Sequence, residues 1–261
     1  MIFVHDISPV LFRLWFLEIR WYGVLFALGL MAAYFVILHF WKKNGYKVAD
    51  LESLVIYIFV GLVVGARLGH IFFYNPSYFL SHPVEILKIW EGGLASHGAA
   101  IGVFLAYLLW VKIHRVPFSK YVDTIVLGIP LMTGFVRIGN FFNSEIVGTR
   151  SENFGVIFTR LGEDFPRHPV QIYSALIKLA IFVIIIILYK KYSARAPKMF
   201  FLFLYLLLYF SGRFIVEFWK DLQGPFESLP ITMGQLLSIP GILIGAGYFI
   251  LRFFSRRGAT K

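Results

Sequence analysis

Long apolar runs recur along the chain and are separated by short polar connections. A helix that crosses a membrane needs about 20 mostly apolar residues. Seven stretches meet this requirement, namely 21–40, 51–73, 94–111, 121–141, 170–189, 199–218 and 231–253. The pattern therefore predicts an all-α polytopic membrane protein with about seven transmembrane helices.

We expect residues 1–261 to form a single integral membrane domain with one small extracytoplasmic cap. The cap is the insert at about 143–169, which is the longest connection between two predicted spans. Within it, glycines at 148, 155 and 162 accompany the alternating stretch from Phe154 to Phe158, which favours a short strand pair. Residues 1–20 mix polar and apolar side chains and lack a basic stretch before an apolar run, so they predict an interfacial segment rather than a cleavable signal.

The composition supports the membrane class and excludes a water-soluble fold. Hydrophobic residues make up 59% of the chain and charged residues 15%, and the mean hydropathy is +0.75. A soluble fold could not cover its surface with so few polar groups. The chain is therefore expected to be embedded in a membrane.

The net charge of +11 indicates orientation in the membrane rather than binding to nucleic acid. Fourteen of the 25 Lys and Arg lie in alternate connections, at 42–47, 112–120, 190–198 and 252–261. Basic connections face the cytoplasm. With seven spans, the N-terminus is then outside and the C-terminus cytoplasmic, and no nucleic-acid partner is needed to explain the charge.

The absence of cysteine excludes disulfides, thiolate nucleophiles and cysteine metal sites together. Any sulfur chemistry would have to use the thiol of a substrate. The histidines show no ligand spacing and have no acidic cluster beside them, so neither a metal site nor another cofactor is predicted.

The stretch from Gly134 to Glu145 places charge at the end of an apolar segment. It carries Arg137, Asn140, Asn143 and Glu145. A lone arginine near the end of a span is usually an anchor that reaches the lipid headgroups. The alternative is an arginine that faces a cavity and needs an anionic partner.

Polar side chains interrupt two further spans. In the second span, Arg67 follows the small-residue ridge of Gly61 and Gly65, which favours close helix packing. At the start of the third span, small residues including Gly98 surround His97. Histidine is a common general base, but a hydrogen-bonded structural histidine is the alternative.

The sixth span carries Tyr209, Arg213 and Glu217 at successive fourth positions, so they share one helical face. Two ionisable groups would not face lipid. The alternative is an Arg213–Glu217 ion pair that only sets the helix register. Tyr22 begins the first span, where an aromatic belt is the competing interpretation. Lys178, in the fifth span, receives no role from the pattern.

Six short motifs stand in a specific order along the chain. They are RWYG at 20–23, GARLG at 65–69, GGLASHG at 92–98, RIGNFFNSE at 137–145, HPVQIY at 168–173 and RFIVEF at 213–218. In these motifs the chain resembles the prolipoprotein diacylglyceryl transferase family, from the first span to the sixth. It departs from the family signature at Val136 and Ser144, where that signature has glycine, and at Ala99, where many members have a second glycine.

The resemblance implies both a reaction and a set of working residues. The diacylglyceryl group of phosphatidylglycerol is moved to the thiol of the lipobox cysteine in a prolipoprotein signal peptide, which forms a thioether and releases glycerol 1-phosphate. The residues that the resemblance assigns to the site are Tyr22, His97, Arg137, Asn140, Glu145, Tyr209 and Arg213.

The residue types suit that chemistry. Guanidinium groups bind a phosphodiester and stabilise the charge of a leaving phosphate, so Arg137 and Arg213 are assigned to the phosphate, with Arg67 as a third candidate. His97 is the candidate base for the substrate thiol. The remaining predicted substrate-binding residues are Asn140, Asn143, Glu145, Gly98 and Glu217.

One competing function class comes from the same cations. Arginines within spans could instead line the pathway of a transporter for anionic lipid or small anions. No inverted repeat is visible between the two halves of the chain, which disfavours that interpretation.

Overall fold

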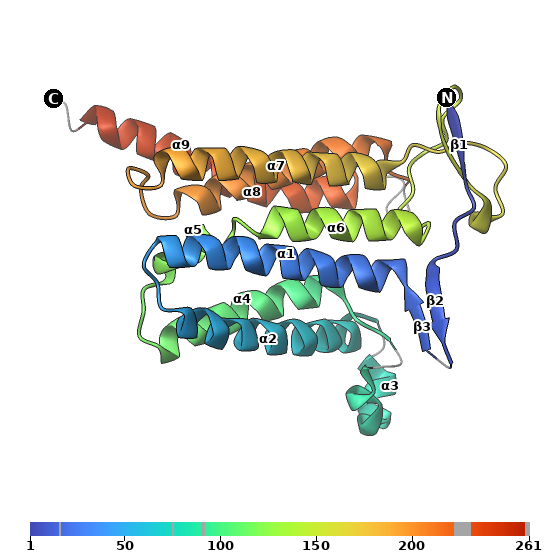
Figure 1. The fold of residues 1–261 in the computed structure, drawn as a ribbon, viewed down its shortest axis with the longest axis horizontal. Helices are drawn as coiled ribbons and strands as arrows, with labels where there is room; N and C mark the ends of the chain where they lie inside the picture. Colours follow the sequence, from blue (N-terminus) through green and yellow to red (C-terminus); the bar gives the residue numbers. More distant parts are fainter. Residues whose placement is uncertain (16, 75, 90–91, 222–230, 259–261) are drawn as a thin grey trace. The chain divides into compact units, whose positions relative to one another are not determined.

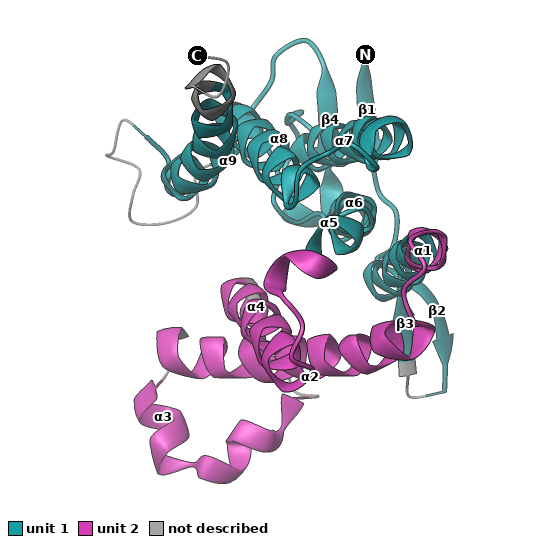
Figure 2. Ribbon diagram, turned by 90° about the vertical axis from the view of Figure 1, so that its left-hand side faces the viewer, with its two compact units in different colours: residues 1–37, 122–261 teal, residues 38–121 magenta. Residues whose placement is uncertain are grey.

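The computed structural model describes residues 1–15, 17–74, 76–89, 92–221 and 231–258 (Figure 1). Residues 259–261, which end the fourth basic stretch, and the connection 222–230 lie outside the described residues. The chain divides into two compact units, residues 1–37 with 122–261 and residues 38–121 (Figure 2). Each unit is described separately below.

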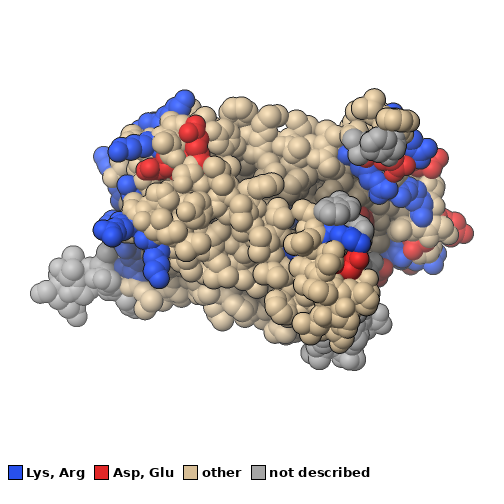
Figure 3. Space-filling view, turned by 90° about the horizontal axis from the view of Figure 1, so that it is seen from below, with Lys and Arg blue, Asp and Glu red and all other residues tan. Residues whose placement is uncertain are grey.

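Helices dominate the described residues, and the prediction of an all-α membrane protein is confirmed. Six helices are long and apolar enough to cross a membrane, and a shorter apolar helix covers His97–Ile113. In Figure 3 the charged side chains gather toward the helix ends, while uncharged residues cover the helix flanks between them. Such flanks are suited to lipid.

The first unit holds most of the long helices. Its elements, in chain order, are β1 (Ile2–His5), β2 (Val10–Leu14), β3 (Leu17–Arg20), α1 (Trp21–Lys43), α5 (Val122–Ile125), α6 (Ile129–Phe142), β4 (Gly155–Phe158), η4 (Thr159–Leu161), α7 (Val170–Tyr192), α8 (Phe200–Val216), η5 (Glu217–Trp219) and α9 (Met233–Gly258). The unit boundary falls within α1, after residue 37. Helix α8 packs against both α7 and α9, and α6 packs against α7.

The fourth predicted span is interrupted rather than continuous. A turn at 126–128 separates α5 from α6, and Pro130 stands in the first turn of α6. Proline cannot donate the backbone hydrogen bond of a helix interior but fits a first turn, so the residues before it leave the helical path. The remaining helix α6 carries the predicted site residues at its C-terminal end.

The insert forms the predicted strand, but its partner lies far away in the sequence. Strand β4 pairs in parallel with β1, with Ile2 opposite Gly155 and His5 opposite Phe158. The first residues of the chain therefore join the insert, while β2 and β3 form a separate antiparallel hairpin. A strand pattern indicates that a segment pairs, but not with which segment.

The second unit contains α2 (Val48–Tyr74), α3 (Pro76–Ser81), η1 (Pro83–Leu87), α4 (Ser96–Ile113) and η3 (Phe118–Lys120). The glycine ridge of α2 packs against Gly98 and Gly102 of α4. A methyl group added to Gly102 would lie only 2.8 Å from the Cα of Gly65. Only glycine permits this approach, so the close helix packing that the glycine spacing predicts is confirmed.

Candidate functional site

The polar residues at the end of α6 are joined by hydrogen bonds. Arg137 Nη1 donates to Asn140 Oδ1 at 3.4 Å, and Asn140 Nδ2 donates to Glu145 Oε2 at 3.1 Å. Asn143 Nδ2 donates to the other oxygen, Glu145 Oε1, at 3.0 Å. The two amides therefore orient one carboxylate, and Asn140 connects it to the Arg137 guanidinium.

The backbone around Glu145 is held in a tight turn. Its amide donates to the Asn140 carbonyl at 3.0 Å, and its own carbonyl accepts 2.7 Å from Nε2 of the buried Gln171. The residues on either side, Ser144 and Ile146, have φ of 57° and 55°. Left-handed backbone is unfavourable for residues with a Cβ, above all for β-branched isoleucine, and such strain occurs often at functional sites.

The carboxylate of Glu145 lines a polar cavity of about 760 Å³ within the first unit. The cavity lies between β3, the start of α1 and the end of α6, and its lining includes Glu18, Arg20, Tyr22, Asn143 and Glu145. A cavity with carboxylates, an amide and a phenol can bind a hydroxylated molecule through hydrogen bonds.

Tyr22 is positioned by close packing on α6. Its ring lies against Gly139, where an added Cβ would come within 2.9 Å of Tyr22 Cδ2. Beside it, Trp21 stacks on Phe142 with ring centroids 5.0 Å apart. These contacts tie the start of α1 to the helix end that carries Arg137 and Asn140.

Helix α8 brings the other predicted cation to the same region. Arg137 interacts electrostatically with Arg213 and with Tyr22, Tyr209 and Glu217. Arg213 Nε is buried and has no hydrogen-bond partner among the described residues. Two guanidinium groups that repel each other inside a helix bundle mark a place that can hold an anion.

Glu217 does not form the ion pair that was the alternative for this helix face. Its Oε1 accepts from Lys220 Nζ at 3.1 Å, and no Arg213–Glu217 ion pair occurs among the described residues. Glu217 is itself buried, and an added Cβ at Gly234 would collide with its carboxylate. Its position is therefore set by Lys220 and by the start of α9.

Lys178 is the residue that the sequence pattern left without a role. It projects from α7, is only 7% exposed, and its Nζ lies 5.4 Å from the centroid of the Tyr209 ring. It also interacts electrostatically with Arg137 and Arg213. A lysine near the outer part of an otherwise apolar span was the available sequence signal, but only the fold shows which residues face it.

In the second unit, Arg67 is bonded to backbone rather than left free for a ligand. It donates to four carbonyl oxygens, those of Glu85 at 2.5 Å, Ile86 at 3.0 Å, Gly92 at 2.8 Å and Gly93 at 3.2 Å. Four of its five N–H groups are thus used. The geometry favours a role in holding the connection between α2 and α4, and phosphate binding by Arg67 stays a prediction.

His97 and Gly98 begin α4. The side chain of His97 is exposed, whereas Gly98 is buried against α2, where an added Cβ would lie 2.7 Å from the Cα of Gly69. The small residues around the histidine therefore include one that packs two helices together. Catalysis by His97 and substrate binding by Gly98 stay predictions.

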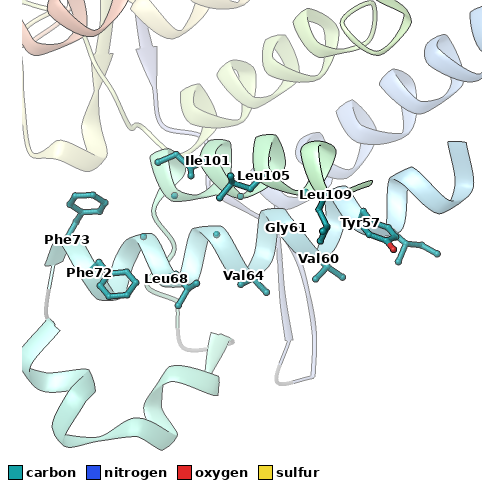
Figure 4. Close-up of a pocket in the computed structure, with 16 residues that line it drawn as sticks. Tyr57, Val60, Gly61, Val64, Leu68, Phe72, Phe73, Ile101, Leu105 and Leu109 are labelled. Carbon is teal, nitrogen blue, oxygen red and sulfur yellow. The ribbon is translucent and has the colours of Figure 1, made fainter. Parts of the chain in front are cut away.

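The second unit also carries an apolar groove of about 610 Å³ along α2 and α4 (Figure 4). Side chains such as Val64, Leu68, Phe72 and Leu105 surround its glycine floor. With no charged side chain in its lining, this groove can accommodate hydrocarbon but cannot bind a charged group. The groove therefore differs from the cavity beside Glu145, whose lining includes charged side chains.

Known proteins match the chain over nearly its whole length. Residues 9–251 match the family described as prolipoprotein diacylglyceryl transferase. The chain belongs to this family. A phosphatidylglycerol–prolipoprotein diacylglyceryl transferase of Tolumonas auensis is 43% identical over 250 residues, which cover 94% of this chain and 95% of the relative.

Proteins of the same name from other bacteria are also similar. The one from Chloroherpeton thalassium is 39% identical, with 92% of this chain and 90% of the relative covered. The one from Geobacter sulfurreducens is 36% identical, with 96% and 97% covered. The family match spans every predicted site residue, from Tyr22 to Glu217.

Membership of the prolipoprotein diacylglyceryl transferase family gives meaning to one departure from its signature. Ser144 stands where the signature has glycine, and the structure places it at φ 57°. Glycine adopts this conformation without steric cost. The departure therefore leaves the turn that presents Glu145 in place, at the expense of backbone strain.

Proposed function

We propose that this chain transfers the diacylglyceryl group of phosphatidylglycerol to the thiol of the lipobox cysteine of a prolipoprotein, and releases glycerol 1-phosphate. The observation that supports this function is the pair Arg137 and Arg213 within the helices of the first unit, beside a polar cavity that presents Glu145. A phosphoglycerol headgroup has matching chemistry, since it joins an anionic phosphate to two hydroxyl groups.

The transfer breaks the bond between a glyceryl carbon and a phosphate oxygen. The cysteine sulfur supplies the electron pair of the new carbon–sulfur bond, and the departing oxygen keeps the pair of the old one. Negative charge therefore grows on the phosphate during the reaction. Planar, permanently charged guanidinium groups outside bulk water are suited to stabilise it, and we assign Arg137 and Arg213 to this role.

The headgroup glycerol is assigned to the polar cavity. The Glu145 carboxylate, oriented by Asn140 and Asn143, can accept hydrogen bonds from the glycerol hydroxyl groups. Tyr22 and Tyr209 can donate from the neighbouring helices α1 and α8. This arrangement would hold the reacting carbon in one orientation, which is a large part of catalysis when two molecules must meet.

A base must remove the thiol proton, because the thiolate is the nucleophile. We assign that step to His97, whose imidazole is exposed at the first turn of α4. The substrate's own cysteine is the nucleophile, in keeping with a chain that contains none.

We place the site toward the extracytoplasmic side of the inner membrane, with the N-terminus outside and the C-terminus in the cytoplasm. The support is the distribution of charge along the helices. Lys190 and Lys191 occupy the last turn of α7, whereas Gln171, which bonds to Glu145, lies in its first turn. Basic helix ends favour the cytoplasm, so the opposite end of α7 is outside.

Purified protein in phosphatidylglycerol nanodiscs with a lipobox peptide tests the proposal. The expected result is a peptide whose mass rises by one diacylglyceryl group, together with one equivalent of glycerol 1-phosphate. A peptide with serine in place of cysteine is the control and should not react. Release of glycerol 1-phosphate without a thioether would contradict the proposal, and an anion or lipid transporter predicts neither product.

The phosphate assignment has its own test. Arg137→Lys and Arg213→Lys keep the charge but lose the planar fork of donors. Each should lower kcat/KM by about tenfold to a hundredfold, the size expected for a lost hydrogen bond to a charged group. Normal rates in both variants would sink the assignment of the two arginines to the phosphate.

A further inference from the structure

Lys178 is a buried cation within the helices of the first unit. It lies in the ninth position of α7, between Ile177 and Leu179, and 7% of its surface is exposed. An ammonium group removed from water is strongly unfavourable unless an opposite charge or several hydrogen bonds compensate for the loss. The residues that surround Lys178 should therefore explain why it is there.

The protein contacts of Lys178 compensate only weakly. Its Nζ donates to the Ser174 carbonyl at 3.4 Å, a long hydrogen bond, and faces the ring of Tyr209 from 5.4 Å. No carboxylate of the described residues forms an ion pair with it. The charged groups that interact with it are instead two more cations, Arg137 and Arg213.

Helix direction explains how the three cations meet. Side chains of an α-helix lean toward its N-terminus. The first turn of α7 contains Gln171, which bonds to Glu145, and the helix runs away from this end of the unit. Lys178 therefore leans back toward Glu145, by one turn, and reaches Ser174. Helices α6 and α8 run in the opposite sense and have their C-terminal ends at this end of the unit, so the side chains of Arg137 and Arg213 lean away from it, toward the middle of the helices. The side chains of three helices thus converge, although their charges repel.

We propose that Lys178 is a third phosphate-binding cation, which contacts the phosphate of the leaving glycerol 1-phosphate. The inference rests on the proposed function and extends it. A phosphodiester carries one negative charge, and the phosphate monoester that departs approaches two at neutral pH. Three converging cations match the more highly charged product better than the bound lipid, so Lys178 acts mainly on the charge that develops as the carbon–oxygen bond breaks.

The convergence of charge also explains the position of Tyr209. Its ring offers its face to the Lys178 ammonium, while its place on α8 is one turn before Arg213. A cation over an aromatic face is stabilised modestly, by less than a full counter-ion would provide. The ring therefore holds Lys178 in position without neutralising it, and leaves its charge for the phosphate.

The experiment compares Lys178→Met with Lys190→Met on the same helix. Lys190 is exposed in the last turn of α7, far along the helix from the site, and serves as the matched control. For each protein, kcat and KM for phosphatidylglycerol are measured with saturating lipobox peptide, and the inhibition constant of added glycerol 1-phosphate is measured in the same assay. Thermal unfolding in detergent reports whether the variants are folded.

In Lys178→Met we expect the inhibition constant of glycerol 1-phosphate to rise by about tenfold to a hundredfold, with a comparable fall in kcat and a smaller change in KM. Lys190→Met should match the unmodified chain. Lys178→Arg keeps the charge and should recover most of the product binding. An unchanged inhibition constant of glycerol 1-phosphate in a folded Lys178→Met variant would overturn the proposal. A lysine with a purely structural role would change the unfolding temperature but not this inhibition constant.

A direct binding measurement separates this inference from the proposed function. Calorimetric titration of glycerol 1-phosphate into detergent-solubilised protein needs no lipobox peptide and no turnover. Weaker binding by Lys178→Met than by Lys178→Arg supports the inference even if thioether formation fails. Equal binding by both variants overturns it even if thioether formation succeeds. If Lys178→Met does not fold, Lys178→Gln replaces it in the same comparison.

Discussion

The side-chain amide of Asn140 lies between a cation and an anion, and contacts both. Its Oδ1 accepts from Arg137 Nη1 at 3.4 Å, and its Nδ2 donates to Glu145 Oε2 at 3.1 Å. Asn140 is only 5% exposed, so water cannot readily replace either contact. An amide is the side chain that offers both a donor and an acceptor at this position.

Asn140→Asp should therefore be strongly deleterious. The new carboxylate would face Glu145 with an acceptor instead of a donor, and one buried hydrogen bond to a charged group would become a repulsion. We expect kcat/KM for thioether formation to fall at least about tenfold, measured with phosphatidylglycerol and a lipobox peptide. Asn153→Asp, at an exposed position of the insert, is the control. Similar rates for the two variants would contradict the role given to Asn140.

Ser144→Gly should stabilise the protein. Ser144 has φ 57°, and its Oγ is buried without a hydrogen-bond partner among the described residues. Glycine removes the left-handed strain, about 1–2 kcal/mol, and also the buried hydroxyl. The measurement is the unfolding free energy in detergent. Ser151→Gly, where the backbone is not left-handed, should be neutral or destabilising; equal signs for both variants would refute this explanation.

His5 should make the cap sensitive to acid. Its ring is fully buried and lies 4.6 Å from the Phe141 ring and 5.4 Å from the Phe158 ring, centroid to centroid. Burial lowers the pKa of His5 below its usual 6.5, as does the nearby charge of Arg160, while Asp6 opposes the shift. The unfolded chain then binds a proton more readily than the folded chain, so stability falls as the pH drops below about 6.5.

The comparison for His5 is the pH dependence of the unfolding temperature between pH 7.5 and 5. His5→Phe removes the titrating group and should lose less stability over this range than the unmodified chain. His82→Phe, at an exposed histidine of the second unit, should keep the original pH dependence. Parallel curves for the unmodified chain and His5→Phe would show that the buried imidazole does not titrate in this range.

Gly98 and Gly102 should respond alike to an added methyl group. At Gly98 the methyl would lie 2.7 Å from the Cα of Gly69, and at Gly102 it would lie 2.8 Å from the Cα of Gly65. Both alanine variants should push α2 and α4 apart and lose about 1–3 kcal/mol of stability. If Gly98 serves packing, the kcat/KM of the folded fraction falls equally in both. A much larger loss in Gly98→Ala would instead support direct substrate contact at that position.

Arg67→Lys should test whether Arg67 is structural. Lysine has three donors and cannot reach the four carbonyl oxygens that the guanidinium joins. We expect a loss of about 1–3 kcal/mol of stability for each carbonyl left without a partner, seen as a lower unfolding temperature. Arg13→Lys, at an exposed arginine, is the control. A raised KM for phosphatidylglycerol with unchanged unfolding would favour the phosphate role instead.

Much of the candidate site was predictable because its residues violate the pattern of their surroundings. Arg137, Asn140 and Glu145 stand out at the end of an apolar segment, and Arg213 shares a helix face with Tyr209. A charged side chain at membrane depth is energetically unfavourable and usually has a function. Such residues can therefore be recognised as site candidates from the sequence alone. Lys178 violates the pattern equally, but without a recognised motif around it the sequence offered no partner and hence no role.

Other features depended on contacts between distant residues. The pairing of β1 with β4 joins residues about 150 positions apart, and the bonds of Arg67 reach a connection up to 26 residues away. No periodicity encodes such partners. The left-handed turn at Ser144 also escaped prediction, since serine gives no local signal for a positive φ.

The sequence alone determined the membrane class, the approximate spans and the two arginines of the proposed phosphate site. Hydrophobic length and charge placement act locally, and the membrane imposes them on each segment separately. The tertiary structure decided which polar groups are already satisfied by protein and which are left for a ligand. Arg67 is engaged by carbonyl oxygens, whereas Arg213 keeps a buried donor without a partner among the described residues and Lys178 converges on the arginines. That distinction depends on where neighbouring helices place their side chains, which no single segment specifies.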